Sequence, residues 1–368
     1  METADLRQPT SPTPPAQDIT DRALAFGRRH LLYGVLSAYG IAFLLPEPGL
    51  ASRREVLTRI HCPGLGAPMA VTLPTVLLAV LLFTAALTVP TGSFAAAARR
   101  PGPLLAAVAA NALLPLLLLP ALAATVSWLP GSEGLIAGLA LVAAMPVAAG
   151  ATVYGARAGA DPALTVAAVL CSTALSPLVI PLTLAEGARL TSGDSAEDLG
   201  DLMSVGTGPF AVLNVVAPCA LGLVARRLAA RRLVAGRAAG GLRWAKAASL
   251  GATVLLTYIN GSGVPKAVLA GPDAVLFAAD VLLAAALCGA SLACGWALSR
   301  ARGLDPGDTA AVTIAAGMNN SSASAVLAAT HLSDHPQILL PILAYGLLQA
   351  LLAGTADWAL RRRRDAYP

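Results

Sequence analysis

The chain consists mainly of apolar runs of about 20 residues, separated by short polar breaks. A run of that length, folded as an α-helix, can cross the hydrocarbon core of a bilayer. Only 12% of the residues are charged and 56% are hydrophobic, with a mean hydropathy of +0.70, whereas about 25% of the residues of a soluble domain are charged. A soluble enzyme is therefore disfavoured, and the sequence predicts an all-α polytopic membrane protein.

The apolar runs predict ten transmembrane helices, five in each half of the chain. We expect a disordered cytoplasmic tail at 1–25, which lacks the apolar segment of a signal peptide. The tail is followed by a first five-helix repeat at 26–190 and an acidic non-cytoplasmic loop at 191–201. A second five-helix repeat at 202–360 and a basic cytoplasmic tail at 361–368 complete the predicted order. The predicted spans are 28–45, 70–89, 102–127, 133–156, 161–185, 202–225, 243–262, 274–298, 308–331 and 336–360.

The distribution of basic residues fits an even number of spans. With ten spans, 20 of the 25 lysines and arginines fall on the side of the amino terminus, among them the seven between Arg226 and Lys246. Basic residues concentrate on the cytoplasmic side of membrane proteins. We therefore expect a multi-pass protein of the inner (cytoplasmic) cell membrane with both termini cytoplasmic. Membrane lipid, rather than nucleic acid, is then the expected partner of the net charge of +5.

Two of the predicted spans do not have the sequence of an ordinary helix. The fourth has Pro146 and Gly150 near its middle, and the ninth has four polar residues in a row, Asn319 to Ser322, after Gly317. Proline removes a backbone donor, and polar side chains at the bilayer midplane are costly unless they pair or line a cavity. Broken helices bring free backbone groups to a solute or ion site. The alternatives are a simple kink at Pro146 and hydrogen bonding between helices at 317–322.

The two predicted breaks occupy matched positions in the two halves. Pro146 lies 118 residues after the start of the first span at 28, and Gly317 lies 115 residues after the start of the sixth at 202. Repeats of five spans enter the membrane with opposite orientation, as in many secondary transporters. The sequence thus predicts two inverted five-helix repeats in which helices 4 and 9 are discontinuous.

Several segments resemble the bile acid:sodium symporter family. The region of the second and third spans is matched by Thr88–Pro90 through Pro101, followed by Asn111–Pro115. The fourth and fifth spans are matched by Pro146–Thr152, Asp161 and Cys171–Pro177. In the ninth span, Gly317-Met318-Asn319-Asn320-Ser321 is similar to the family motif Gly-Met-Gln-Asn-Ser. The resemblance implies ten helices in a panel domain (spans 1, 2, 6 and 7) and a core domain (spans 3–5 and 8–10), and sodium-coupled uptake of a small organic anion.

The resemblance also implies the site residues. Substrate would bind where helices 4 and 9 cross, and sodium, the only ion or cofactor expected, would bind nearby. The implied substrate-binding residues are Asn319, Asn320, Ser321, Ala149, Gly150 and Thr152, and the implied sodium ligands are Asn111, Thr152, Thr165 and Asn319.

The sequence departs from the family at the sodium sites. Ala315 stands where members with well-defined sodium sites have a glutamate two residues before the Gly-Met pair, and Val169 replaces a threonine. The remaining oxygens are neutral, so two-sodium coupling is disfavoured, while one-sodium symport with an anionic substrate stays open. A proton-coupled or uncoupled carrier is the alternative. For proton coupling Asp280 and Asp308 are the titratable candidates, and we expect both at the membrane interface.

Other functional classes have less support from the sequence. Enzyme signatures such as HExxH, GxSxG and a P-loop are missing, so we do not expect an enzyme, and a membrane sensor would need a soluble domain. The five cysteines lack the paired spacing of a zinc site. Substrate identity and oligomeric state do not follow from the sequence.

Overall fold

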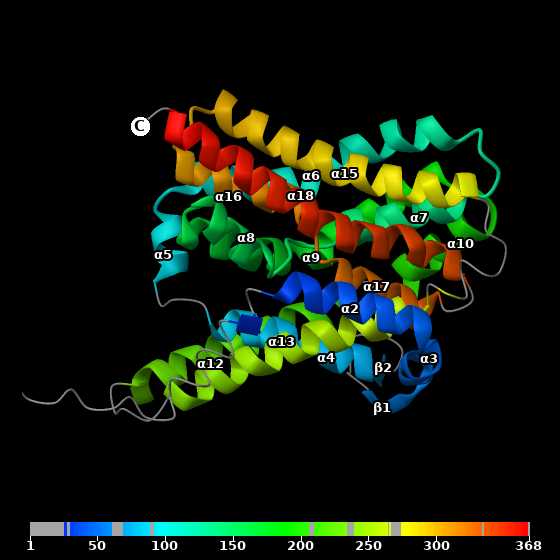
Figure 1. Ribbon diagram of the computed structural model, residues 1–368, viewed down its shortest axis with the longest axis horizontal. Coiled ribbons are helices and arrows are strands. Elements are labelled where there is room, and N and C mark those ends of the chain that lie inside the picture. Colours follow the sequence, from blue (N-terminus) through cyan, green and yellow to red (C-terminus); the bar gives the residue numbers. More distant parts are fainter. Residues whose placement is uncertain are drawn as a thin grey trace, which may run out of the picture.

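The computed structural model describes residues 26–27, 30–60, 69–88, 92–205, 210–233, 239–263, 265, 274–332 and 335–366. Its helices form two layers, with a short two-stranded hairpin at one end (Figure 1).

The first layer contains four long elements and the hairpin. Helix α13 contacts α2, α3 and α4, and α4 also contacts α12. The hairpin pairs β1 with β2 antiparallel, from Val56 opposite Thr72 to Ile60 opposite Met69. The elements of this layer are α2 (Leu31–Leu44), α3 (Pro46–Arg54), β1 (Val56–Ile60), β2 (Met69–Thr72), α4 (Leu73–Leu87), the π-helix η1 (Ala211–Val216), α12 (Ala217–Leu233) and α13 (Ala239–Gly261).

The second layer contains the remaining helices, with α15 packed on α6, α16 and α18, and α9 packed on α6 and α7. Its elements are α5 (Ser93–Ala98), α6 (Pro101–Val126), α7 (Ser132–Ala143), α8 (Ala151–Ala158), α9 (Pro162–Leu190), α10 (Gly193–Val205), α15 (Ala274–Ala301), α16 (Pro306–Gly317), α17 (Ser321–His331), η2 (Pro336–Ile338) and α18 (Leu339–Ala366).

Each of the ten predicted spans overlaps a helix or a pair of consecutive helices. Among the described residues, five helices are long and apolar enough to cross a membrane: α6, α9, η1 with α12, α15 and α18. A sixth span would result if α2 and α3, which meet at a bend of 92°, were counted together. Apolar helices of this length and number establish a multi-pass membrane protein of mainly α-helical structure.

Both predicted breaks are present. Helix α7 ends at Ala143 and α8 begins at Ala151, while α16 ends at Gly317 and α17 begins at Ser321. The simple-kink interpretation of Pro146 is therefore wrong. Four other prolines, Pro115 and Pro120 in α6 and Pro177 and Pro181 in α9, lie inside continuous helices. Proline alone therefore does not separate the two halves of the fourth span.

Three boundaries differ from the sequence-based expectations. The acidic segment predicted as a loop at 191–201 forms most of α10, and the basic residues predicted as a tail at 361–368 continue α18 as far as Ala366. The hairpin was not predicted, and its strand β1 is fully exposed. The predicted tail at 1–25 lies outside the described residues.

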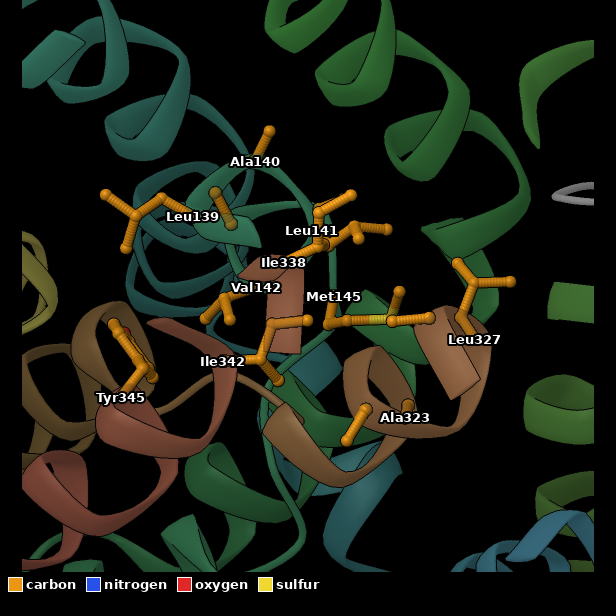
Figure 2. Packing of buried hydrophobic residues seen from close by; sticks show 14 of the residues in the cluster. Leu139, Ala140, Leu141, Val142, Met145, Ala323, Leu327, Ile338, Ile342 and Tyr345 are labelled. Atoms are coloured by element: carbon orange, nitrogen blue, oxygen red, sulfur yellow. The ribbon is translucent and has the colours of Figure 1, made fainter. Parts of the chain in front are cut away.

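The half-helices α7, α16 and α17 are largely buried. Side chains of α7 and of the residues just after it converge on those of α17 and on the segment from η2 into α18, as Figure 2 shows for Leu141, Met145, Leu327 and Ile342. All twelve residues of α7 are buried. This packing holds the two breaks at a fixed place between the layers.

Candidate functional site

The two breaks cross as a short antiparallel backbone pair. Val147 lies opposite Asn319. The Ala148 N–H donates to the Met318 carbonyl at 2.8 Å, and the Asn320 N–H donates to the Pro146 carbonyl at 2.9 Å. Each break thereby supplies partners for backbone groups that the other leaves free, as a membrane interior requires.

Neighbouring side chains brace the second break, residues 318–320. The carbonyl of Gly317, at the end of α16, accepts hydrogen bonds from the Tyr345 hydroxyl at 3.0 Å and from the Cys288 thiol at 3.3 Å. Asn111 Nδ2 donates to Asn319 Oδ1 at 2.8 Å, and both side chains are buried. Asn320 Oδ1 caps α17 by accepting from the Ala323 N–H at 3.2 Å.

The first break, residues 144–150, has fewer side-chain partners. The Val147 N–H donates to Ser172 Oγ at 3.1 Å, and the Thr152 hydroxyl donates to the Ala149 carbonyl at 2.8 Å. Within the described part of the chain the N–H groups of Ala149 and Gly150 have no hydrogen-bond partner. These two donors precede α8, where the helix dipole favours an anion.

A cavity of about 270 Å³ lies where the crossing meets the first layer, and we call it the central cavity. Both breaks and α18 form one wall, and the carboxyl-terminal half of α4 and the first part of α13 form the other. Its described lining residues are Leu78, Leu81, Leu82, Thr84, Ala85, Thr88, Ala148, Ala149, Gly150, Thr152, Val153, Lys246, Ser249, Leu250, Thr253, Asn319, Asn320, Ser321, Ser322 and Gln349.

The structure brings all six residues implied as substrate-binding to this cavity: Ala149, Gly150, Thr152, Asn319, Asn320 and Ser321. Asn111 lies behind them and reaches the cavity only through its bond to Asn319. Thr165 does not line the cavity, and its hydroxyl donates to the Asp161 carbonyl at 2.8 Å.

The implied sodium ligands fit the ion only in part. Sodium is a hard cation that prefers several oxygen ligands, and a charged one compensates for the cost of dehydration. Asn111, Asn319, Thr152 and Thr165 supply neutral oxygens. Ala315 is buried in an apolar cluster with Ala311 and Ile314, and no Asp or Glu occurs among the described residues of the central cavity. The carboxylate position of the family is thus apolar here.

Among the polar residues of the cavity that sequence reasoning missed, Lys246 and Gln349 stand out. Lys246 of α13 is the single charged residue among the described lining residues, although the sequence placed it in a basic cytoplasmic stretch. Gln349 of α18 is buried, and its Nε2 donates to Ser321 Oγ at 2.9 Å. A lone lysine or glutamine inside an apolar run signals such a position, because polar groups in a span usually have a functional partner.

The two aspartates expected at the membrane interface are both buried within the protein. Asp280 lies inside α15 at 5% exposure, and its Oδ1 has no hydrogen-bond partner among the described residues. Asp308, in the first turn of α16, forms an ion pair with Arg100, which holds Asp305 as well. Their place near the membrane interface stays a prediction.

Comparison of the sequence with known protein families gives a match. The sequence profile of the Sodium Bile acid symporter family matches residues 75–265, just over half of the chain. The chain belongs to this family, whose members are transporters rather than enzymes and carry bile acids or other organic anions with sodium. Among curated proteins no match is found. The first break and Lys246 lie within the matched residues, and the second break lies beyond them.

Proposed function

We propose that this protein is a secondary active transporter that carries a small organic anion by alternating access, with the anion bound in the central cavity. The observation that carries the proposal is the charge of that cavity. Lys246 lines it together with the free N–H groups of Ala149 and Gly150, and no acidic residue lines it within the described part of the chain. Such a set of donors favours a carboxylate or a similar oxyanion.

The arrangement of helices supports ten spans in two inverted repeats. The first layer, with α2, α4, α12 and α13, corresponds to the four spans of a panel domain, and the second layer corresponds to a core domain with crossing helices 4 and 9. The starts of α6, α9 and α16 meet at one end, where Arg100 binds Asp305 and the Asp161 N–H donates to the Gly307 carbonyl. We assign this basic end to the cytoplasm of a cell with the protein in its inner membrane.

The position of the cavity supports a state that is open toward one side. Its residues on α4 and α13 lie near the ends of these helices that we assign to the cytoplasm. Beyond it the two layers are in contact: the Tyr39 hydroxyl donates to the Leu343 carbonyl at 3.4 Å, and Leu256 and Ile259 are fully buried. Transport would require the second layer to move so that this contact opens while the cytoplasmic end closes.

Membership of the family favours transport that is coupled to one sodium ion. The substrate anion would then supply the negative charge near the ion, because the family's glutamate is replaced by Ala315. Proton coupling is the second candidate, and Asp280 is the observation that favours it. A buried carboxyl with an unpartnered oxygen inside a span is a group that can take up and release a proton.

Uptake into proteoliposomes tests the proposal. Taurocholate and benzoate would be offered under an imposed sodium gradient, an imposed proton gradient or neither. We expect uptake of at least one anion, and Asn320→Ala and Lys246→Gln should reduce it about tenfold or more, because a charged hydrogen bond contributes about 1.5–3 kcal/mol. Lys246→Arg keeps the charge and should retain most of the activity. Absence of uptake under every gradient would show that the proposal is wrong.

A further inference from the structure

A second cavity, of about 320 Å³, lies at the end of the molecule opposite the central cavity. We call it the arginine cavity. One side is formed by α3, the hairpin and the end of α13, and the other by the end of α17 and the start of α18. Its described lining residues are Leu50, Arg53, Arg54, Val56, Ala70, Thr72, Gly263, Ala329, Thr330 and Leu339.

The two cavities share α17 and α18 as part of their walls. On α17, Ser321 lines the central cavity and Thr330 lines the arginine cavity. These residues are nine positions apart, roughly 14 Å at the rise of an α-helix. On α18, Gln349 lines the central cavity and Leu339 lines the arginine cavity. The layer contact around Tyr39 and Leu343 lies between the two cavities along these helices.

Within the described residues neither Arg53 nor Arg54 of this cavity forms an ion pair or a hydrogen bond. Arg53 is partly buried and Arg54 is exposed. Each guanidinium group carries five donors that an anion can use. Arg53 Nη1 lies against the backbone of Gly263, close enough that a side chain there would clash. Loss of solvation, followed by repulsion from Arg54, lowers the pKa of Arg53 to about 10.

An anion between the two guanidinium groups would relieve the lost solvation of Arg53 and the repulsion between the two arginines. The lining contains no acidic side chain within the described part of the chain, so no carboxylate of these lining residues competes for this place. Both layers contribute residues to the wall. An organic anion that travels between the layers would therefore meet this place on its way.

We propose that the arginine cavity is a second anion site, which binds the carboxylate of the transported organic anion on the side away from the cytoplasm before the layer contact at Tyr39 opens. The proposal rests on the transport function proposed above for the identity of its ligand. Binding itself does not depend on transport, so the two can fail separately.

Chemical protection tests binding without a need for transport. Phenylglyoxal, which modifies arginine side chains, would be applied to the full-length protein in phosphatidylcholine liposomes, with taurocholate, benzoate or succinate present. Peptide mass spectrometry would follow Arg53, Arg54 and Arg59, an exposed arginine on β1 outside the cavity lining. We expect at least one anion to slow modification of Arg53 and Arg54 severalfold and to leave Arg59 unchanged.

Two results would overturn the proposal. One is equal modification with and without all three anions. The other is protection by phosphatidylglycerol in the liposomes with no added anion, which would assign the arginines to a lipid headgroup. If protection is seen but no anion is transported, the site stands and the transport function fails.

Variants connect the site to uptake. Arg53→Gln with Arg54→Gln should raise the KM for uptake from the non-cytoplasmic side about tenfold, with little change in the maximal rate, because a charged contact is lost only in the first binding step. Arg53→Lys with Arg54→Lys should restore much of the affinity, and Arg59→Gln should behave as wild type. An unchanged KM in the double glutamine variant would contradict the role of the site.

Discussion

The two breaks of this protein are paired in space but are held in different ways. The second break is surrounded by donors from three other helices, with Tyr345, Cys288 and Asn111 all bonded to Gly317 or Asn319. The first break relies on the backbone of the second and on Ser172, and leaves two N–H groups free. The difference teaches that a broken helix can be a fixed frame or a binding surface, depending on how many side chains of other helices bond to it.

Among the changes predicted here, the largest loss of stability should come from adding a methyl group at Gly317, beside the second break. Gly317→Ala would place a Cβ about 2.4 Å from Leu292 Cγ and 3.2 Å from the Cys288 carbonyl oxygen. Overpacking of a buried site costs about 1–3 kcal/mol, and we expect a loss in the upper part of that range. The measurement is the free energy of unfolding in detergent.

The matched change at the first break is Gly150→Ala. The nearest atom to the new Cβ is Met318 Cε at 3.8 Å, and the backbone φ of −58° is ordinary for alanine. We expect almost no change in stability. A loss equal to that of Gly317→Ala would remove the distinction between frame and binding surface.

The second largest loss of stability should come from breaking the buried hydrogen bond between Asn111 and Asn319. Asn111→Ala leaves Asn319 Oδ1 without its donor, which costs about 2 kcal/mol for a buried polar group. The same unfolding measurement should show that Asn111→Ala and Asn319→Ala together cost less than the sum of the two. Strict additivity would mean that the hydrogen bond at 2.8 Å contributes nothing to the second break.

A smaller loss of stability is expected from removing the side-chain bond that α9 makes to the first break. Ser172→Ala removes the acceptor of the Val147 N–H and should cost about 1 kcal/mol. The control is Ser176→Ala, four residues along α9, because the Ser176 hydroxyl donates only to Thr173 in its own helix. Equal losses of stability for the two variants would show that Ser172 does not hold the break.

The smallest effect is a pH dependence at the start of α16. Hydrogen bonds from the Asp308 N–H and from Arg100 hold the pKa of Asp305 below its ordinary value. A lowered carboxyl pKa contributes stability above the unfolded value of about 3.9, and this contribution is lost as the pH falls through the folded value. The contribution is small because the side chain is half exposed. Asp305→Asn keeps the helix cap without titrating, so its melting temperature should fall less between pH 5 and pH 3 than that of the wild type. An equal fall would assign the acid sensitivity to other groups.

The breaks could be predicted because their signal is local. Pro146 with Gly150, and the run from Gly317 to Ser322, are anomalies that can be read inside a single apolar segment. The backbone pairing of Val147 with Asn319 followed once two such segments were expected to cross. The six residues implied as substrate-binding then gathered at one cavity, while Asn111 and Thr165 did not.

The bracing residues could not be found in this way. Tyr345, Cys288 and Gln349 lie on helices whose rotation is set by packing along their whole length, so their contacts with residues 317–321 have no local signal. The burial of Asp280 could not be predicted for a related reason. Its distance from the end of a span does not tell which way the side chain faces, and at 5% exposure it is packed within the protein.

Helix α18 has a practical consequence. It continues from the buried Tyr345 to Ala366 without interruption, and the Arg362 guanidinium stacks on the Trp358 ring at 4.0 Å near its last turn. A helical fusion partner joined in phase to this end would be held in a fixed orientation relative to the second layer. At 36.9 kDa the protein is small for single-particle electron microscopy. Such a rigid fiducial would let images of individual molecules test whether the two layers move relative to each other.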